Sequence, residues 1–487
     1  EQAYTLGLDV ATTIDWDLQQ AATRALRKGL VDAQAGRGYE GPEGHVAGLD
    51  VGADAAAVRA ALRPFPDSGA LRAALVLRAS KADGVDAVLR DGTALRLAPG
   101  TLPASARAML AQARGLATGA VIRVVHTQPQ GWRLAQLPRM EGALVALDAA
   151  SGEIRALVGG FDHQLNQFDH ATQAQRQPGS TFKPFIFSAG LEHGLFPGTV
   201  TDDSPREVTP AGRGQRAWQP RNYGDRYVGP ITLRRGLAQS RNMVAINVME
   251  AAGARNVQQF VTRFGFDPAR TPAVLPLALG AGSTSVLALA RGYGVFANGG
   301  ALTASTLVRE VRTRDGDVLF AAAPAQRVRA VTPRNAYVMD DLLRDVVRQG
   351  TARAATALGR ADVAGKTGTS NDSRDVWFAG YASGVVGVVW AGYDTPRSLG
   401  RATGGTLALP IWIDFMRSAV RNRTEVHRPP PEDLVRHGGD WVYREALAQG
   451  CGPSGHRLMR SPLQCAVAQP LLPLVVPGTG DDDDDDD

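Results

Sequence analysis

Pro178-Gly179-Ser180-Thr181-Phe182-Lys183 is the stretch around which the rest of this sequence can be ordered. Proline and glycine predict a turn here, and the apolar residues that follow predict a helix over about 181–193. At helical spacing, Ser180 and Lys183 lie on one face. A serine hydroxyl is a weak nucleophile until a base takes its proton, and a lysine amine can be that base when burial lowers its pKa. The stretch therefore indicates a serine nucleophile with lysine as its base.

A second short motif is Ser240-Arg241-Asn242, within a helical pattern predicted over 231–252. The hydroxyl of Ser240 can relay a proton between Lys183 and a leaving amine. The amide of Asn242 can hold a substrate carbonyl or Lys183 itself. A triplet of this kind carries almost no information alone, so its weight depends on the other motifs.

The third motif is Lys366-Thr367-Gly368-Thr369. We expect its glycine to let a substrate backbone lie close alongside a strand. The N–H groups of Thr369 and Ser180 would form an oxyanion hole, in which one donor contributes about 2.7–4 kcal/mol to the transition state. Lys366 would supply positive charge to a substrate carboxylate and to the Ser240 hydroxyl. The predicted catalytic residues are Ser180, Lys183, Ser240, Asn242 and Lys366, and the predicted substrate-binding and oxyanion residues are Thr367, Gly368 and Thr369.

Lysine is scarce in this sequence, which has only Lys28, Lys81, Lys183 and Lys366 among its 53 basic residues. Arginine cannot lose its proton in a protein, whereas lysine can. Two of the four lysines fall in the positions that the chemistry above requires. The joint appearance of the three motifs is therefore hard to attribute to coincidence.

The distribution of patterns predicts several domains. Residues 1–63 are interpreted as a linker region, with a strand over 5–13 and a helix from about 16 to 30 that Asp15 can cap. Short strand candidates with a hairpin signal at Asp91-Gly92 predict a small β-barrel or sandwich over 64–140. The strand candidates in this module are 71–78, 87–97, 119–126 and 132–137.

A different order of elements begins at Glu141. Two strands, then mostly helices, then further strands predict an antiparallel sheet with helices packed against it over 141–425. Residues 426–487 are predicted to be an irregular tail that ends in an acidic run. Outside the motifs, helices are predicted at 256–264, 285–298, 333–348 and 409–420, and strands at 142–147, 154–158, 306–312, 375–382 and 385–392.

Charge and composition restrict the partners. The net charge is +5, and no basic patch is interleaved with aromatic residues, so we expect solvated surface charge and no nucleic-acid partner. No apolar run is long enough to span a membrane, so we expect membrane contact only through an anchor upstream of Glu1. Cys451 and Cys465 have no metal-ligand spacing with histidine; a disulfide and two unrelated thiols fit equally well. We predict neither a metal nor another cofactor.

The three motifs, in this order, resemble the signature set of penicillin-recognising serine enzymes. Residues 176–184, 229–234, 297–300 and 365–371 resemble class A, high-molecular-mass penicillin-binding proteins, with the 1A group as the nearest, but without their glycosyltransferase domain. Residues 7–19 resemble the linker of these proteins, and 64–140 is similar to the barrel insertion of the 1A group. One departure is Asp169-His170, where the family usually carries Asn-Arg.

The resemblance implies an α/β transpeptidase domain of the serine β-lactamase-like fold with an inserted small OB-like β-barrel. It implies a D,D-transpeptidase that cross-links peptidoglycan stem peptides, taking a D-Ala-D-Ala donor and an amine acceptor, and that penicillin and other β-lactams acylate. It further implies a periplasmic position, a parent protein with a glycosyltransferase domain anchored in the inner membrane, and an outer-membrane lipoprotein activator that binds the β module. Trp218, Asn222 and Tyr223 would line the groove, although a surface loop with a buried tryptophan fits them equally well.

Other interpretations stay open at this point. A D,D-carboxypeptidase or serine β-lactamase would share the motifs, but these hydrolases are generally compact and lack the region 1–140. A penicillin-sensing or scaffold module would be acylated without turnover. His163 and His170 stand beside Asp162 and Asp169 and invite a Ser-His-Asp triad, but we interpret these pairs as solvated loop residues.

Overall fold

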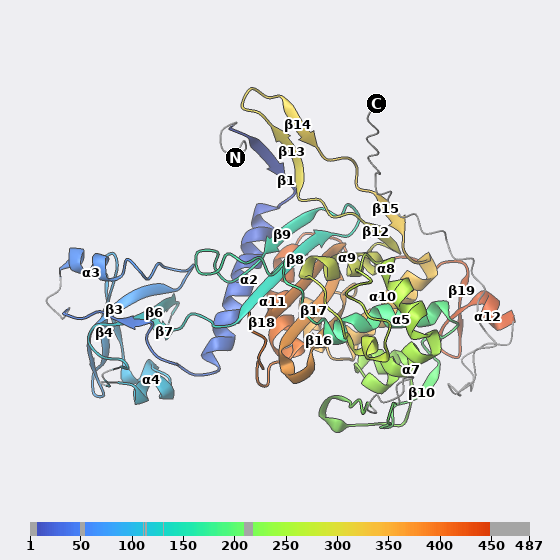
Figure 1. Ribbon diagram of the computed structural model, residues 1–487, viewed down its shortest axis with the longest axis horizontal. Helices are drawn as coiled ribbons and strands as arrows, with labels where there is room; N and C mark the ends of the chain where they lie inside the picture. The colour runs from blue at the N-terminus through green and yellow to red at the C-terminus, as the bar shows by residue number, and fades with distance from the viewer. Residues whose placement is uncertain are drawn as a thin grey trace, which may run out of the picture.

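Figure 1 shows a computed structural model of the chain, in which a small β module lies at one end of a larger α/β body. The structure describes residues 7–48, 54–110, 112, 114–129, 131–208 and 218–448. Helix α2 (Trp16–Ala35) lies between the module and the body. The two cysteines, the acidic run and most of the predicted tail lie outside the described residues.

A five-stranded antiparallel sheet forms the centre of the body. Its order is β16-β17-β18-β8-β9, so strands from two distant parts of the chain share one sheet. The predicted antiparallel sheet with packed helices is confirmed. The strands are β8 (Glu141–Asp148), β9 (Ile154–Val158), β16 (Ala364–Thr369), β17 (Asp375–Ala382) and β18 (Val385–Gly392).

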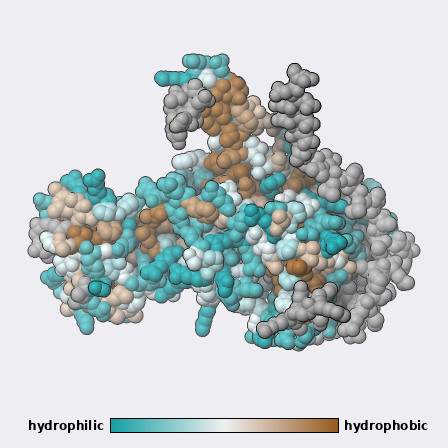
Figure 2. All heavy atoms as spheres, in the orientation of Figure 1, coloured by the Kyte–Doolittle hydropathy of each residue, from teal (hydrophilic) through white to brown (hydrophobic). Residues whose placement is uncertain are grey.

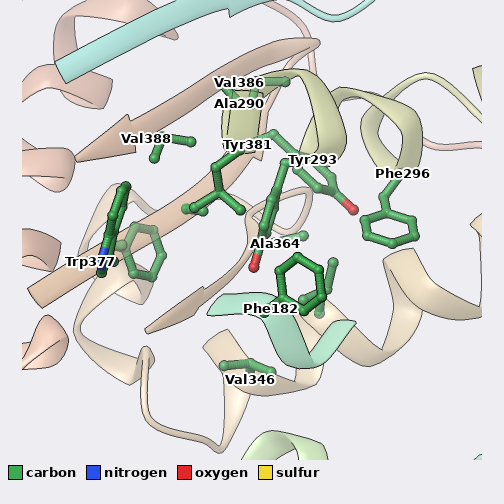
Figure 3. Close-up of a cluster of buried hydrophobic side chains, with 14 of the residues drawn as sticks. Phe182, Ala290, Tyr293, Phe296, Val346, Ala364, Trp377, Tyr381, Val386 and Val388 are labelled. Carbon is green, nitrogen blue, oxygen red and sulfur yellow. The ribbon is translucent and has the colours of Figure 1, made fainter. Parts of the chain in front are cut away.

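Helices cover both faces of this sheet. Gly387 of β18 lies against Trp412 of α11, whereas the neighbouring Val386 and Val388 lie on the side of α9, near Ala290 (Figure 3). Helix α2 packs on the same face as α11, where Asp15 caps its first turn by accepting from the N–H of Leu18. The main helices besides α2 are α5 (Lys183–Glu192), α6 (Leu233–Ala238), α7 (Asn242–Ala252), α8 (Ala254–Thr262), α9 (Val286–Ala297), α10 (Pro333–Arg348) and α11 (Leu409–Ala419).

The β module has its own sheet and its own hydrophobic core. The sheet order is β2-β6-β3-β4-β5, with β7 paired to the other end of β6. The predicted boundary at residue 64 divides residues that share this sheet, because β2 pairs with β6. Since Tyr39 also belongs to the core of the module, we propose a start near residue 39. The strands are β2 (Gly44–His45), β3 (Arg72–Ser80), β4 (Gly84–Leu89), β5 (Ala94–Leu97), β6 (Ala120–Thr127) and β7 (Gly131–Ala135), and the short helices are α3 (Ala55–Ala61) and α4 (Ala104–Ala108).

A third sheet projects from the body near the first described residues. It consists of β1 (Asp9–Thr12), β13 (Val308–Arg312) and β14 (Val318–Ala321). Figure 2 shows apolar side chains gathered on this projection, and Val318, Leu319 and Phe320 are each about half exposed.

Among the described helices, none combines the length and the apolar character needed to cross a membrane.

Three two-stranded antiparallel sheets complete the body. Two of them pair β10 (Val200–Asp202) with β11 (Pro230–Thr232), and β12 (Ala301–Thr303) with β15 (Arg327–Arg329). The third pairs β19 (Leu434–His437) with β20 (Asp440–Tyr443) and leads into α12 (Arg444–Ala448). This last hairpin brings part of the region beyond residue 425 back onto the body.

Arg234 holds the last hairpin to the helices. Its guanidinium contacts Asp341 and Asp345 of α10 and Asp440 of β20, and its side chain is only 18% exposed. Removing one partner of such a buried cluster leaves carboxylates without a cation, which costs about 3–5 kcal/mol. We expect Arg234→Met to lower the free energy of unfolding by about that amount, measured by urea denaturation.

The matched control is Arg206→Met. Arg206 pairs with Glu250 at the surface, where both side chains are more than a third exposed. An exposed pair contributes about 0–1 kcal/mol. Equal losses of stability in the two variants would contradict the role given to Arg234.

Candidate active site

The turn that carries Ser180 is fixed by its neighbours in the chain. It is a single 3-10 turn, η2 (Gly179–Phe182), which runs directly into α5. The hydroxyl of Thr181 donates to the carbonyl of Pro178, and the hydroxyl of Tyr293 donates to the carbonyl of Thr181 at 2.8 Å. Phe182 points into the core (Figure 3). Because side chains at i and i+3 eclipse in a 3-10 turn, Ser180 and Lys183 are left on one side.

Lys183 is fully buried, and its amine has two close acceptors. Nζ donates to the carbonyl oxygen of Ser240 at 2.6 Å and to Oδ1 of Asn242 at 2.7 Å. Burial, and after it the positive charge of Lys366, hold the pKa of Lys183 well below its ordinary value, while Asp203 raises it. A neutral amine has two hydrogens, which these two acceptors take. Its lone pair then remains free to accept a proton.

Ser240 lies in a break between two helices. The predicted single helix over 231–252 is wrong here, because α6 ends at Ala238 and α7 begins at Asn242. Ser240 has a φ of 58°, a conformation that costs a residue with a side chain of order 1–3 kcal/mol. The break turns the carbonyl of Ser240 and the amide of Asn242 toward Lys183. Such strain is typical of functional sites.

Lys366 contacts the same serine from the edge strand β16. Its Nζ donates to the hydroxyl of Ser240 at 2.7 Å and to the carbonyl of Thr367 at 3.0 Å. Burial lowers the pKa of Lys366 to about 7. The Ser240 hydroxyl also lies 3.4 Å from Nζ of Lys183. Once Lys183 has gained a proton it can donate to this hydroxyl, whose own hydrogen stays available for a leaving group, so the groups form a path for a proton.

Two glycines allow the nucleophile turn to approach β16. Gly179 has a φ of +54°, and a Cβ added to it would lie 2.7 Å from the carbonyl oxygen of Thr369. A Cβ on Gly368 would lie 2.7 Å from the carbonyl oxygen of Pro178. The side of Gly368 on which a Cβ would stand therefore faces the turn. That this glycine lets a substrate backbone lie alongside the strand stays a prediction. The close approach places the backbones of Ser180 and Thr369 next to each other.

These elements border a groove of about 890 Å³. The buried Asn222, the exposed Tyr223 and residues 371–373 are among the residues that line it. Lys183 and Lys366 lie buried behind it. Of the predicted site residues, Ser180, Ser240, Asn242, Thr367 and Thr369 line the groove. The structure thus brings together all three motifs of the sequence.

The arrangement has known counterparts. A family model described as the penicillin binding protein transpeptidase domain matches residues 142–417, more than half of the chain. The chain belongs to this family. A second model, described as the penicillin-binding protein OB-like domain, matches residues 39–140. The family assignment and the α/β fold with an OB-like module, both expected from the motifs, are confirmed.

Named relatives agree with this assignment. The chain is 41% identical over 93% of its length to penicillin-binding protein 1A of Neisseria lactamica, and 35% identical over 92% to penicillin-binding protein 1A of Pseudomonas aeruginosa. The crystal structure of penicillin-binding protein 1A from Haemophilus influenzae superposes with a TM-score of 0.83 at 30% identity, covering 94% of this chain and 74% of that one. The chain spans 58% of the Neisseria protein and 61% of the Pseudomonas protein.

The histidines that the structure describes lie outside the groove. His170 is fully buried, with Nε2 2.6 Å from a carboxylate oxygen of Asp394 and Nδ1 2.8 Å from the carbonyl of Gly159. The interpretation of His170 as a solvated loop residue is therefore wrong. Its ring stacks on Trp390. The histidine that departs from the family pattern is therefore a buried packing residue.

Sequence reasoning missed some residues of the transpeptidase site. Thr351 shares a hydrogen bond with the hydroxyl of Thr367 at 2.6 Å, and Asp203 lies buried beneath Asn222. Neither belongs to a short motif, and both reach the site through contacts distant in sequence. Trp218, which the resemblance placed on the groove, packs instead against the hydrophobic core and pairs with Val208.

Proposed function

We propose that this chain is a D,D-transpeptidase that cross-links peptidoglycan through an acyl-enzyme on Ser180. The observation that carries the proposal is the contact of Ser240 with both buried lysines, beside the nucleophile turn. A hydroxyl between two amines of lowered pKa can pass a proton from one group to another.

The proposed reaction has two steps. The Ser180 oxygen attacks the carbonyl of the penultimate D-alanine of a donor stem peptide, and its proton goes to the amine of Lys183. The N–H groups of Ser180 and Thr369 bind the negative oxygen of the tetrahedral intermediate. Ser240 passes the proton to the departing D-alanine, and an amine of a second stem peptide then attacks the ester and frees Ser180. Lys366, Thr367 and Gly368 hold the donor along β16.

β-Lactams fit the same chemistry. Attack by Ser180 opens the lactam ring, and the ring nitrogen stays attached to the acyl group instead of leaving. The resulting ester blocks the groove. We therefore propose penicillin and other β-lactams as covalent ligands of Ser180.

The relatives are longer than this chain, so a further proposal concerns the full protein. We infer that the full protein resembles penicillin-binding protein 1A in having a glycosyltransferase domain, an anchor in the inner membrane and a periplasmic position for the residues described above. The OB-like module, with its separate core, is the part that we propose binds an outer-membrane lipoprotein activator.

Labelling with a fluorescent penicillin tests the proposal directly. The protein should carry the label through a denaturing gel, and mass spectrometry should place it on Ser180. Ser180→Ala should lose the label completely while its circular dichroism stays unchanged. A folded wild-type protein without label would refute acylation.

The products with natural peptides separate the possible functions. With a pentapeptide donor and an amine acceptor, a transpeptidase forms a cross-linked dimer. A carboxypeptidase or β-lactamase-like hydrolase releases D-alanine or opened lactam without dimer, and a sensor module takes the label but forms no product.

The pH dependence of acylation should follow the protonation of Lys183 and its coupling to Lys366. Acylation needs the neutral amine of Lys183, so its rate should fall as the pH drops and that amine gains a proton. Lys366→Met removes a positive neighbour, which raises the pKa of Lys183. The acid limb of the normalised profile should therefore move to higher pH, whatever the loss in maximum rate. A shift to lower pH would contradict the coupling of the two amines.

A further inference from the structure

Asn222, in the connection between β10 and β11, is buried and contacts the Ser240–Asn242 motif. Its side chain is only 5% exposed. Its Oδ1 accepts from the N–H of Asn242 at 2.7 Å and, more weakly, from that of Met243 at 3.4 Å. These are the first N–H groups of α7, and Arg241 before them gives no side-chain cap. Asn222 thus does from a distant segment what an N-cap residue does locally.

Asp203 determines which way the Asn222 amide points. It is fully buried, and its Oδ1 accepts from Nδ2 of Asn222 at 2.7 Å. Its Oδ2 accepts from the N–H of Val228 at 3.3 Å and lies 3.5 Å from the guanidinium of Arg241. A carboxylate can only accept. The Asn222 amide must therefore turn its NH₂ group to Asp203 and its oxygen to α7.

Asn242 is consequently held on two sides. Its backbone N–H is bound by Asn222, and its Nδ2 donates to the carbonyl of Arg221 at 2.6 Å. This leaves Oδ1 of Asn242 to accept from Lys183. Asn222 thus fixes the backbone of Asn242, and the carbonyl of Arg221 fixes which way its amide points, so that Oδ1 meets the amine of Lys183.

We infer that Asp203 and Asn222 are positioning residues of the transpeptidase: they hold Asn242 and, through it, aim the amine of Lys183 at Ser180. The inference rests on the acylation of Ser180 proposed above. Asp203 has a second effect, because its charge favours the protonated form of Lys183 and raises the pKa of that amine. The two residues should therefore differ in what their loss does to the pH profile.

Asn222→Ala and Asp203→Asn separate the two effects. The rate of acylation by a fluorescent penicillin would be measured from about pH 5 to pH 9. Asn222→Ala keeps the carboxylate, so we expect acylation to slow by about 10–100-fold at every pH, with the acid limb unmoved. Asp203→Asn keeps the shape but removes the charge. Acylation should slow as well, and the acid limb should move to lower pH.

Asn247→Ala is the matched control. Asn247 lies on the same helix and donates to the Thr201 hydroxyl at 2.7 Å and the Asp202 carbonyl at 2.8 Å, so it ties α7 to β10, which ends just before Asp203. It does not touch the Ser240–Asn242 motif. If Asn222 merely stabilised the helix, both asparagine variants would acylate alike. We expect Asn247→Ala to acylate at the wild-type rate, with the same profile.

A crystal structure of Asn222→Ala provides a readout that does not depend on acylation. The Asn242 amide should leave Lys183, and the 2.7 Å contact between them should be lost. Wild-type acylation in Asn222→Ala and Asp203→Asn, or an unmoved Asn242, would overturn the inference. Absence of label on the wild type would refute the proposed function instead, and the crystal structure would still decide the positioning role.

Discussion

Lys183→Met is expected to slow acylation by penicillin by roughly 10²–10⁴-fold, the contribution of a positioned general base. Methionine is unbranched and apolar, so it can fill the fully buried site that Lys183 occupies. It leaves the hydroxyl of Ser180 without a group to take its proton. Lys183→Arg should be as slow, since a guanidinium supplies positive charge but does not lose its proton. Stopped-flow measurement with a fluorescent penicillin gives the rate.

Lys28→Met is the control for the loss of a lysine. Lys28 lies on α2, and its side chain is 68% exposed and pairs with Asp32 one helical turn away. We expect wild-type acylation in this variant. If Lys183→Arg acylated near the wild-type rate while Lys183→Met did not, Lys183 would act through its charge, and the base would have to be another group.

Local patterns predicted those elements whose causes are local. Asp15 begins α2 because its carboxylate binds the N–H of Leu18, which the sequence shows as a capping residue before a helical run. The strands 375–382 and 385–392 are confirmed with their predicted bounds, because both are almost entirely apolar after Asp375 and are separated by a glycine turn. The same holds for α10 over 333–348, where Thr332 caps the first turn.

Elements that depend on distant partners were missed or misplaced. Gln239 to Arg241 have acceptable helix propensities, so periodicity alone continues the helix through Ser240. The energetic cost of the break at Ser240 is offset by hydrogen bonds from Lys183 and Lys366, which lie far away in the sequence. Strand β16 contains two glycines and no large apolar residue, and only its pairing with β17 makes it a strand.

The candidate site shows the same division. The three motifs named its central residues, since their chemistry requires particular residue types in a recognisable order. Asp203 lies in a short polar run that reads as an ordinary loop. Its burial depends on Asn222, 19 residues further along, and no local pattern contains that relation.

Gly179→Ala should have the second large effect, because it separates the two backbones that border the nucleophile. A methyl group at this position would lie 2.7 Å from the carbonyl oxygen of Thr369, closer than such atoms approach. The turn or the end of β16 must move, and with it the N–H groups of Ser180 and Thr369. A displacement of about 1 Å at a reacting centre costs about 10²-fold in rate. We expect a loss of that size in the acylation rate.

Gly359→Ala separates this effect from backbone strain. Gly359 has a similar left-handed φ of +66°, but nothing lies within 4 Å of an added Cβ. Both variants carry the cost of a side chain at positive φ, which lowers stability. Only Gly179→Ala should also slow acylation when both are measured well below their melting temperatures. Equal rates in the two variants would mean that the approach of the turn to β16 serves folding rather than the alignment of the oxyanion donors.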